Sequence, residues 1–130
     1  MPAMGGTRPS PEQAFEVVNP DGAAPLLLVC DHASRRFPPH LGTLGVAEPD
    51  TFEHIAWDIG AADLTRGLAA ALDAPAVLCG WSRLVVDCNR RLDHPSAFPE
   101  VSDRIAVPGN VSMTGEDRQW RVAAIHTPYH

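Results

Sequence analysis

At 130 residues the chain has the size of one domain with a modest hydrophobic core. Its net charge of -6 argues against nucleic acid or an anionic membrane as a partner, because phosphate binding needs clustered positive charge. No stretch approaches 18 apolar residues and residues 1–10 lack a signal-peptide pattern, so we expect a cytoplasmic protein without a membrane span.

Three cysteines occur, at Cys30, Cys79 and Cys88, each at or near the end of an apolar run. An odd number without Cys-x-x-Cys spacing argues against a disulfide framework and against a cysteine-based zinc finger. We expect buried, reduced thiols that pack as small apolar groups. A catalytic thiol at Cys30 is the alternative, with His32 as the nearby base.

The first predicted elements are two strands. Residues 1–12 are rich in proline and glycine and are predicted to be disordered, which leaves residues 13–130 for the domain. Residues 15–18 alternate in polarity and predict a short edge strand before a turn at residues 19–22. The continuous apolar run of residues 25–30 is typical of a strand covered on both faces, as in parallel sheets.

Asp31 and His32 follow this second strand directly. In open α/β sheets, ligands bind outside the carboxyl ends of the strands, so His32 is a candidate metal ligand or general base. The alternative is that Asp31 and His32 only cap a loop and satisfy each other.

A helical pattern comes next. Residues 37–46 are predicted to be a loop with a single helical turn, and residues 60–73 to be a helix. The pattern begins earlier, at residues 53–60, where His54 and Asp58 are four apart and would share one helical face. Such a pair can ligate a metal, or form a surface ion pair that stabilises a helix by a few tenths of a kcal/mol. The apolar positions of the pattern are Ile55, Ile59, Leu64, Leu68 and Leu72.

Residues 76–79 and 83–88 predict two further strands, and the second has an arginine at each end. It begins at Arg83 and leads into an Asp-x-Asn-Arg tetrapeptide formed by Asp87, Asn89 and Arg90. Arginine presents a rigid fork of donors that matches a carboxylate, asparagine adds a donor and an acceptor, and the aspartate can brace the guanidinium. This segment is therefore a candidate binding surface for a small anion.

The rest of the chain predicts a long loop and a helix. Residues 91–109 contain three prolines and are expected to be an irregular, substrate-side flap, with Asn110 near its end as a weaker contact candidate. Thr114 and Asp117 have capping-box spacing and predict a helix that runs through Ile125. Pro128 is typical of the first turn of a following helix.

These motifs together resemble the N-formylglutamate amidohydrolase family. The matching segments have the family's order and spacing from about residue 15 onward; they are residues 30–34 with Pro38, 54–61, 82–90 and 128–130. The family is similar in fold to zinc carboxypeptidases (phosphorylase/peptidyl-hydrolase-like), which implies a three-layer α/β fold with a mixed, mainly parallel sheet flanked by helices.

The resemblance also implies a chemistry, the hydrolysis of the amide of an N-formyl or N-acyl amino acid by a metal-dependent enzyme. His32 resembles the first ligand of a zinc ion (or another divalent metal) and Asp58 the acidic ligand, and His54 would support the metal or contact substrate. Asn89 and Arg90, assisted by Arg83, resemble the groups that bind the substrate carboxylate. The partner would thus be a small anionic amino-acid derivative.

Family members are about twice as long, so the resemblance implies an N-terminal portion whose sheet is incomplete at the C-terminus. The remaining metal ligand and the general base would come from the missing part, and no catalytic residue is identified within the chain. His130 is a weaker candidate for the third ligand. Two alternatives stay open: a non-catalytic carboxylate-binding module, and an inactive, truncated fragment with an exposed sheet edge and face.

Overall fold

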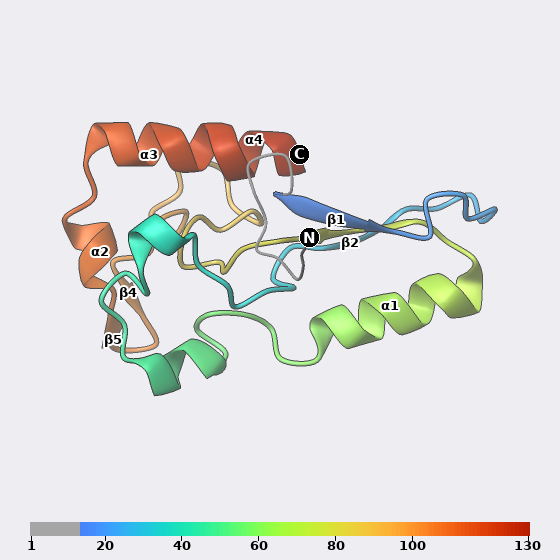
Figure 1. Cartoon of the computed structure of the whole chain (residues 1–130), viewed down its shortest axis with the longest axis horizontal. Coiled ribbons are helices and arrows are strands. Elements are labelled where there is room, and N and C mark those ends of the chain that lie inside the picture. Colours follow the sequence, from blue (N-terminus) through green and yellow to red (C-terminus); the bar gives the residue numbers. More distant parts are fainter. Residues whose placement is uncertain (1–13) are drawn as a thin grey trace.

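The fold is given by a computed structural model that describes residues 14–130. The disorder predicted for residues 1–12 lies outside these described residues. The helices and strands are distributed along the whole described chain (Figure 1). In chain order they are β1 (Phe15–Val18), β2 (Leu28–Cys30), the 3-10 helices η2 (Pro39–Leu41) and η3 (Glu48–Phe52), α1 (Ala61–Leu72), β3 (Ala76–Cys79), β4 (Val101–Ser102), β5 (Ile105–Ala106), α2 (Pro108–Val111), α3 (Gly115–Arg121), the π-helical turn η4 (Val122–His126) and α4 (Thr127–Tyr129).

β1, β3 and β2 form a three-stranded sheet in that order, and β4 and β5 form a separate hairpin within the segment expected to be irregular. β1 is antiparallel to β3, with Phe15 opposite Cys79, whereas β2 is parallel to β3, with Leu28 opposite Ala76. The strands predicted at residues 15–18 and 76–79 are confirmed, and the one predicted at 25–30 is shorter. The α/β class is confirmed. In residues 14–130, however, the sheet is equally parallel and antiparallel, so the three-layer, mainly parallel arrangement is not observed.

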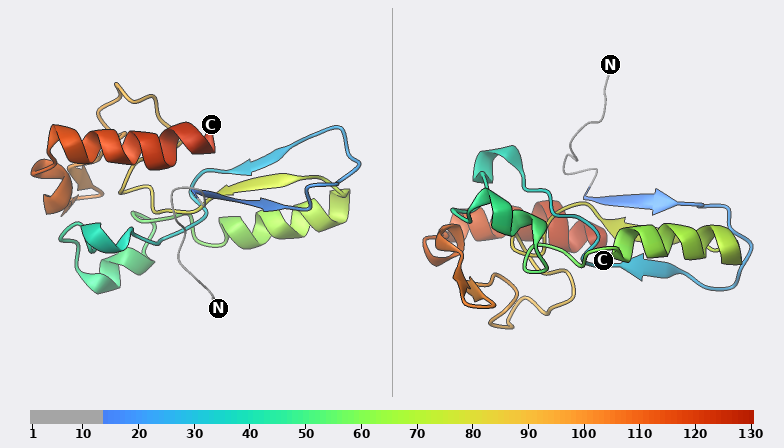
Figure 2. Two further views of the ribbon diagram at one scale, coloured as in Figure 1. Left: turned by 45° about the horizontal axis from the view of Figure 1, so that its top comes forward. Right: turned by 90° about the horizontal axis from the view of Figure 1, so that it is seen from below.

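α1 covers one face of the sheet, as two views of the chain show (Figures 1 and 2). Its buried side is made of alanines such as Ala69, which pack against Cys30, Ala76 and Leu78. Because these side chains are small, the helix backbone can lie close to the strands. The opposite side of α1 carries leucines that face solvent: Leu64, Leu68 and Leu72 are 41–64% exposed. The four-residue apolar pattern therefore predicted the helix but not its buried face.

The helix does not extend back over residues 53–60. The prediction that His54 and Asp58 share one face of a helix is therefore wrong. Gly60 has a φ of +85°, in the left-handed region, and this interrupts any helix that would run through it. Residues 53–60 are turns and bends. His54 and Asp58 consequently do not share a helical face.

The larger hydrophobic core lies beside the sheet, beneath the C-terminal helices. It is built around Ile55, Trp81 and residues 84–86, all fully or almost fully buried. Residues 83–88 were predicted to be a strand, but they form turns and irregular backbone with no strand partner. Side chains satisfy the carbonyls instead: Asn110 Nδ2 donates to Leu84 O at 2.8 Å and Arg121 Nη1 donates to Val85 O at 3.0 Å.

The C-terminal helix begins as predicted. Thr114 Oγ1 accepts a hydrogen bond from the backbone N–H of Asp117 at 3.1 Å, so Thr114 caps α3. α3, η4 and α4 form one continuous helical run over the irregular backbone of residues 83–90, called the irregular segment below (Figure 1). No helix among residues 14–130 is both long and apolar enough to cross a membrane.

Asn110 should matter for stability rather than for substrate contact. Its side chain is 3% exposed, and it donates to Leu84 O and Pro99 O and accepts from Arg121. Asn110→Ala leaves buried polar groups without partners, so we expect the free energy of unfolding to fall by at least about 2 kcal/mol. Urea denaturation measures this. The matched control is Val111→Ala at a 61% exposed neighbour, for which we expect a change within about 0.5 kcal/mol; equal effects would contradict the prediction.

Candidate functional site

The site begins at the carboxyl end of β2, where the strand leads directly into Asp31 and His32 as the sequence predicted. His32 is 7% exposed, and its backbone carbonyl accepts a hydrogen bond from the N–H of Asp58 at 3.0 Å. This bond brings the segment before α1 against the end of β2. The Asp58 side chain thereby reaches the imidazole of His32.

Both ring nitrogens of His32 contact carboxylates. Nδ1 lies 3.1 Å from Asp58 Oδ2, and Nε2 lies 2.7 Å from Asp87 Oδ1. Asp87 is 2% exposed, whereas the Asp58 side chain is 52% exposed. An imidazole between two carboxylates donates to both only when it is protonated, so this arrangement favours a positively charged His32.

Arg83 closes these contacts into a ring. Its Nη1 donates to Asp58 Oδ1 at 3.3 Å and its Nη2 donates to Asp87 Oδ2 at 3.1 Å. We call His32, Asp58, Arg83 and Asp87 the charge ring. Two cations and two anions alternate around it, and each carboxylate uses one oxygen for His32 and the other for Arg83.

The pKa values follow from this arrangement. Burial by itself would lower the pKa of His32, but the hydrogen bond and negative charge of Asp87, helped by Asp58, outweigh burial and raise it. Burial would likewise raise the pKa of Asp87, but His32, the Asn89 N–H and Arg83 together lower it. The ring is therefore most stable with His32 protonated and Asp87 ionised.

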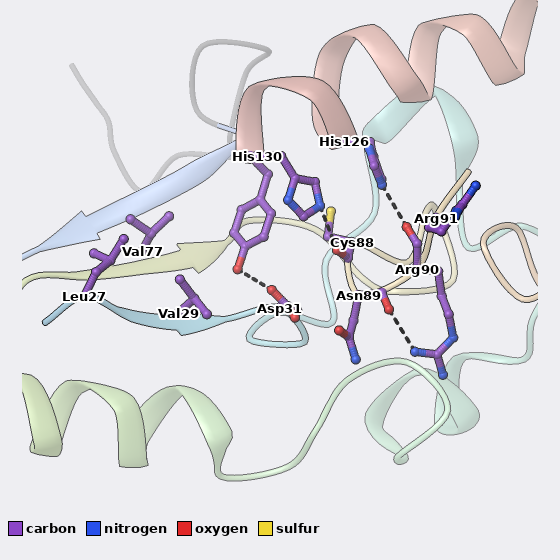
Figure 3. Close-up of a pocket in the computed structure, with 11 residues that line it drawn as sticks. Leu27, Val29, Asp31, Val77, Cys88, Asn89, Arg90, Arg91, His126 and His130 are labelled. Carbon is purple, nitrogen blue, oxygen red and sulfur yellow. Dashed lines mark hydrogen bonds between the residues drawn. The ribbon is translucent and has the colours of Figure 1, made fainter. Parts of the chain in front are cut away.

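Asp87 also connects the charge ring to Asn89 and Arg90. Its Oδ1 accepts the backbone N–H of Asn89 at 2.9 Å, and its carbonyl accepts the N–H of Arg90 at 3.1 Å. These bonds form a tight turn that exposes the Asn89 side chain. Arg90 Nη1 donates to Asn89 O at 3.0 Å (Figure 3).

Asn89 and Arg90 line a pocket of about 620 Å³ between the sheet and the C-terminal helix (Figure 3). The apolar end of the pocket is the surface of β2 and β3, and the polar end is the turn after Asp87. The lining residues are Leu27, Val29, Asp31, Val77, Cys88, Asn89, Arg90, Arg91, His126, Tyr129 and His130.

Tyr129 and His126 line the pocket with polar side chains, and neither was singled out individually from the sequence. Tyr129 Oη donates to Asp31 Oδ1 at 2.6 Å, and burial together with this carboxylate raises the pKa of Tyr129. His126 Nε2 lies 3.0 Å from Arg90 O. The Pro-Tyr-His motif at residues 128–130 was the only sequence signal for this wall of the pocket.

Three candidates lie elsewhere or have other contacts. His54 is 69% exposed and pairs with Asp103 Oδ2 at 2.9 Å, away from the charge ring. Asn110 is buried in the core, as described above. His130 lines the pocket, but its Nε2 lies 2.8 Å from the carbonyl oxygen of Cys88.

The cysteines of residues 14–130 are free and buried, as predicted, and Cys79 Sγ lies 3.7 Å from Cys88 Sγ. Burial raises the pKa of the Cys30 thiol, which disfavours the thiolate that a nucleophile needs. The catalytic-thiol alternative therefore gains no support from the structure.

The charge ring does not fit a complete metal centre. A catalytic zinc takes three protein ligands and one open position. Among residues 14–130, no group of three or more histidine, cysteine, aspartate or glutamate side chains is arranged to hold a metal ion. Both nitrogens of His32 are already hydrogen-bonded to carboxylates.

Comparison with known proteins identifies the family. The family model for N-formylglutamate amidohydrolase matches residues 24–130, so the chain belongs to the N-formylglutamate amidohydrolase family. The crystal structure of a gene product from Agrobacterium tumefaciens is similar, with 39% sequence identity and a TM-score of 0.88. The match covers 92% of this chain and 48% of that one, so the chain spans about half the length of this neighbour. A search of curated proteins finds no match.

The charge ring should make stability depend on pH. Because the pKa of His32 is raised on folding, its contribution is fully present below about pH 6.5 and is lost as pH rises through the folded value. Because the pKa of Asp87 is lowered, its contribution is present above about pH 4 and is lost in stronger acid. We expect His32→Gln to cost more unfolding free energy at pH 5.5 than at pH 8.5, as measured by urea denaturation.

His54→Gln is the control for this experiment, because His54 is exposed and its ion pair is screened by solvent. Its effect should be small at both pH values. An equal loss for His32→Gln at pH 5.5 and 8.5 would show that folding leaves the pKa of His32 unchanged, which would contradict the charge ring.

Proposed function

We propose that this chain provides the carboxylate-binding part of a hydrolase that cleaves the amide bond of an N-formyl or related N-acyl amino acid. The observation that carries the proposal is the position of Asn89 and Arg90. In a chain of the N-formylglutamate amidohydrolase family, both side chains line the pocket and directly follow the charge ring.

Arg90 is suited to the carboxylate, because its guanidinium matches two carboxylate oxygens and, among residues 14–130, bonds only to the adjacent Asn89 carbonyl. The exposed amide of Asn89 adds a donor beside it. Arg83 has a different role in this proposal. Both of its terminal nitrogens contact Asp58 and Asp87, so it positions these two carboxylates instead of contacting the substrate.

Metal dependence is part of the proposal for the family reaction. His32 and Asp58 carry donor atoms that zinc accepts, and a bound zinc would polarise the amide carbonyl and acidify a water molecule. The described residues do not fit a complete site, since they supply no third ligand and His32 is held in the charge ring. We therefore propose no hydrolytic step for residues 14–130 by themselves.

A second function, carboxylate binding without hydrolysis, is favoured by the closed charge ring. Protonated His32 can neither ligate a metal nor accept a proton. In this state Asn89 and Arg90 remain in the pocket, so the ligand's acid group could bind while its amide bond stays intact.

We also propose a three-layer arrangement around the sheet. α1 supplies one outer layer, and the other face of the sheet carries exposed apolar side chains. A second layer packed on this face, which includes Val17, Leu27 and Val29, each 47–59% exposed, would also cover the apolar end of the pocket.

Arg90 should contribute directly to ligand binding. We expect Arg90→Gln to weaken the binding of L-glutamate and N-formyl-L-glutamate by about 1.5–3 kcal/mol, the range for hydrogen bonds to charged groups. Isothermal titration calorimetry measures this, with Arg104→Gln, an exposed arginine in the β4–β5 turn, as the matched control. Equal binding by wild type and Arg90→Gln would exclude the proposed carboxylate site.

Hydrolysis is tested separately from binding. We expect the chain to release no formate from N-formyl-L-glutamate above the buffer control, with or without added zinc, because residues 14–130 lack a three-ligand site. An enzymatic formate assay in zinc and in a chelator measures this. Zinc-dependent formate release that His32→Gln abolishes would instead show that the chain carries a complete metal centre.

A further inference from the structure

The C-terminal helical run donates hydrogen bonds to the irregular segment that carries the site. His126 Nε2 lies 3.0 Å from the carbonyl oxygen of Arg90, and His130 Nε2 lies 2.8 Å from that of Cys88. These two carbonyls belong to the residues on either side of Asn89. A carbonyl oxygen only accepts, so each Nε2 must carry a proton and donate it.

The π-helical turn η4 brings these histidines to the helix face that carries Arg121. Arg121, at the end of α3, already contacts the irregular segment through Val85 O. In a regular α-helix a residue five positions later would lie about 140° away around the axis. In η4 the N–H of Thr127 bonds to Val122 O, five residues back, so the turn is wider and His126 returns toward the face of Arg121.

The helix then returns to regular geometry. The N–H of His130 bonds to His126 O, four residues back, so both imidazoles lie on one face with ring centroids 4.6 Å apart. Figure 3 shows both rings directed at the turn that carries Asn89 and Arg90. Single π turns inside helices are rare and occur frequently at functional sites.

We infer that His126 and His130 are positioning residues, which fix the direction of the Asn89 and Arg90 side chains by holding the carbonyls on both sides of Asn89. The inference rests on the proposed function for the identity of its ligand, a carboxylate. Neither histidine needs to contact that ligand. Their effect is to keep a short turn without sheet hydrogen bonds in one conformation.

The positioning role of the two histidines can be distinguished from a contribution to folding stability. Both histidines are partly accessible, so water can replace their hydrogen bonds at little cost to folding. The direction of the turn would nevertheless become less defined, and a loosely held binding group loses affinity. Glutamine can present its amide nitrogen near the position of a histidine Nε2, whereas leucine fills similar space without a donor.

The test compares His126→Leu, His130→Leu and His126→Gln. We expect each leucine variant to bind L-glutamate about tenfold more weakly, the lower end of the range for removing groups that orient metal-binding side chains. His126→Gln should bind within about threefold of wild type, because the donor is retained. Melting temperatures should stay close to that of wild type in all three. His40→Leu is the control, at an exposed histidine whose ring packs on Trp120 outside the pocket.

Wild-type affinity in the leucine variants would overturn the inference, as would a glutamine variant no better than leucine. A second measurement keeps the inference testable if the wild type does not bind glutamate. The ¹H–¹⁵N heteronuclear NOE of the Asn89 and Arg90 amides should fall in the leucine variants and recover in His126→Gln. An unchanged NOE would refute the positioning role, whereas absence of glutamate binding with the expected NOE changes would refute only the proposed function.

Discussion

The carboxylate of Asp87 is the constraint on which the site depends. An ionised carboxylate that is 2% exposed is costly unless hydrogen-bonded charges compensate it. His32, Arg83 and the Asn89 N–H together provide that compensation. Because these partners come from the end of β2 and from both sides of Asp87, satisfying one buried charge fixes where the strand end and the following turn lie. Asp58 contacts both His32 and Arg83, so the segment before α1 is positioned as well.

The segment around Asp87 has no sheet partner, and side chains from distant parts of the chain replace the missing ladder. Asn110 and Arg121 bond to the carbonyls of Leu84 and Val85. His130 and His126 bond to those of Cys88 and Arg90. The apolar run of residues 84–86 predicted a buried strand. These residues are indeed buried, but they are not a strand. What the apolar run could not indicate is that the donors lie 26 and 36 residues later in the sequence. β1, β3, α1 and the Thr114 cap were predictable, since their signals are local: alternation, apolar runs, helical periodicity and capping-box spacing.

For the site, the sequence correctly predicted that His32 follows a strand end, and it selected the residues that form the charge ring. It anticipated that Asp87 can brace a guanidinium, as it does for Arg83, but not the contacts of His32 with Asp58 and Asp87. Asp87, a weaker candidate in the sequence, is the central residue, whereas His54 points to Asp103 because Gly60 prevents the helix that would have paired it with Asp58. His32 contacts carboxylates with both nitrogens, a consequence of tertiary packing that spacing alone does not encode. Asn110, expected near a flap, is a core residue. Membership of the N-formylglutamate amidohydrolase family then gives the pocket lined by Asn89 and Arg90 its chemical context.

The most direct test of this account is the protonation of the His32 imidazole. A long-range ¹H–¹⁵N correlation spectrum, with His32 assigned through His32→Gln, reports the state of each ring nitrogen. The charge ring predicts that Nδ1 and Nε2 both carry protons at pH 7, because each faces a carboxylate oxygen. A neutral ring with one unprotonated nitrogen at that pH would contradict the account, since one of the two carboxylates would then have no donor from His32.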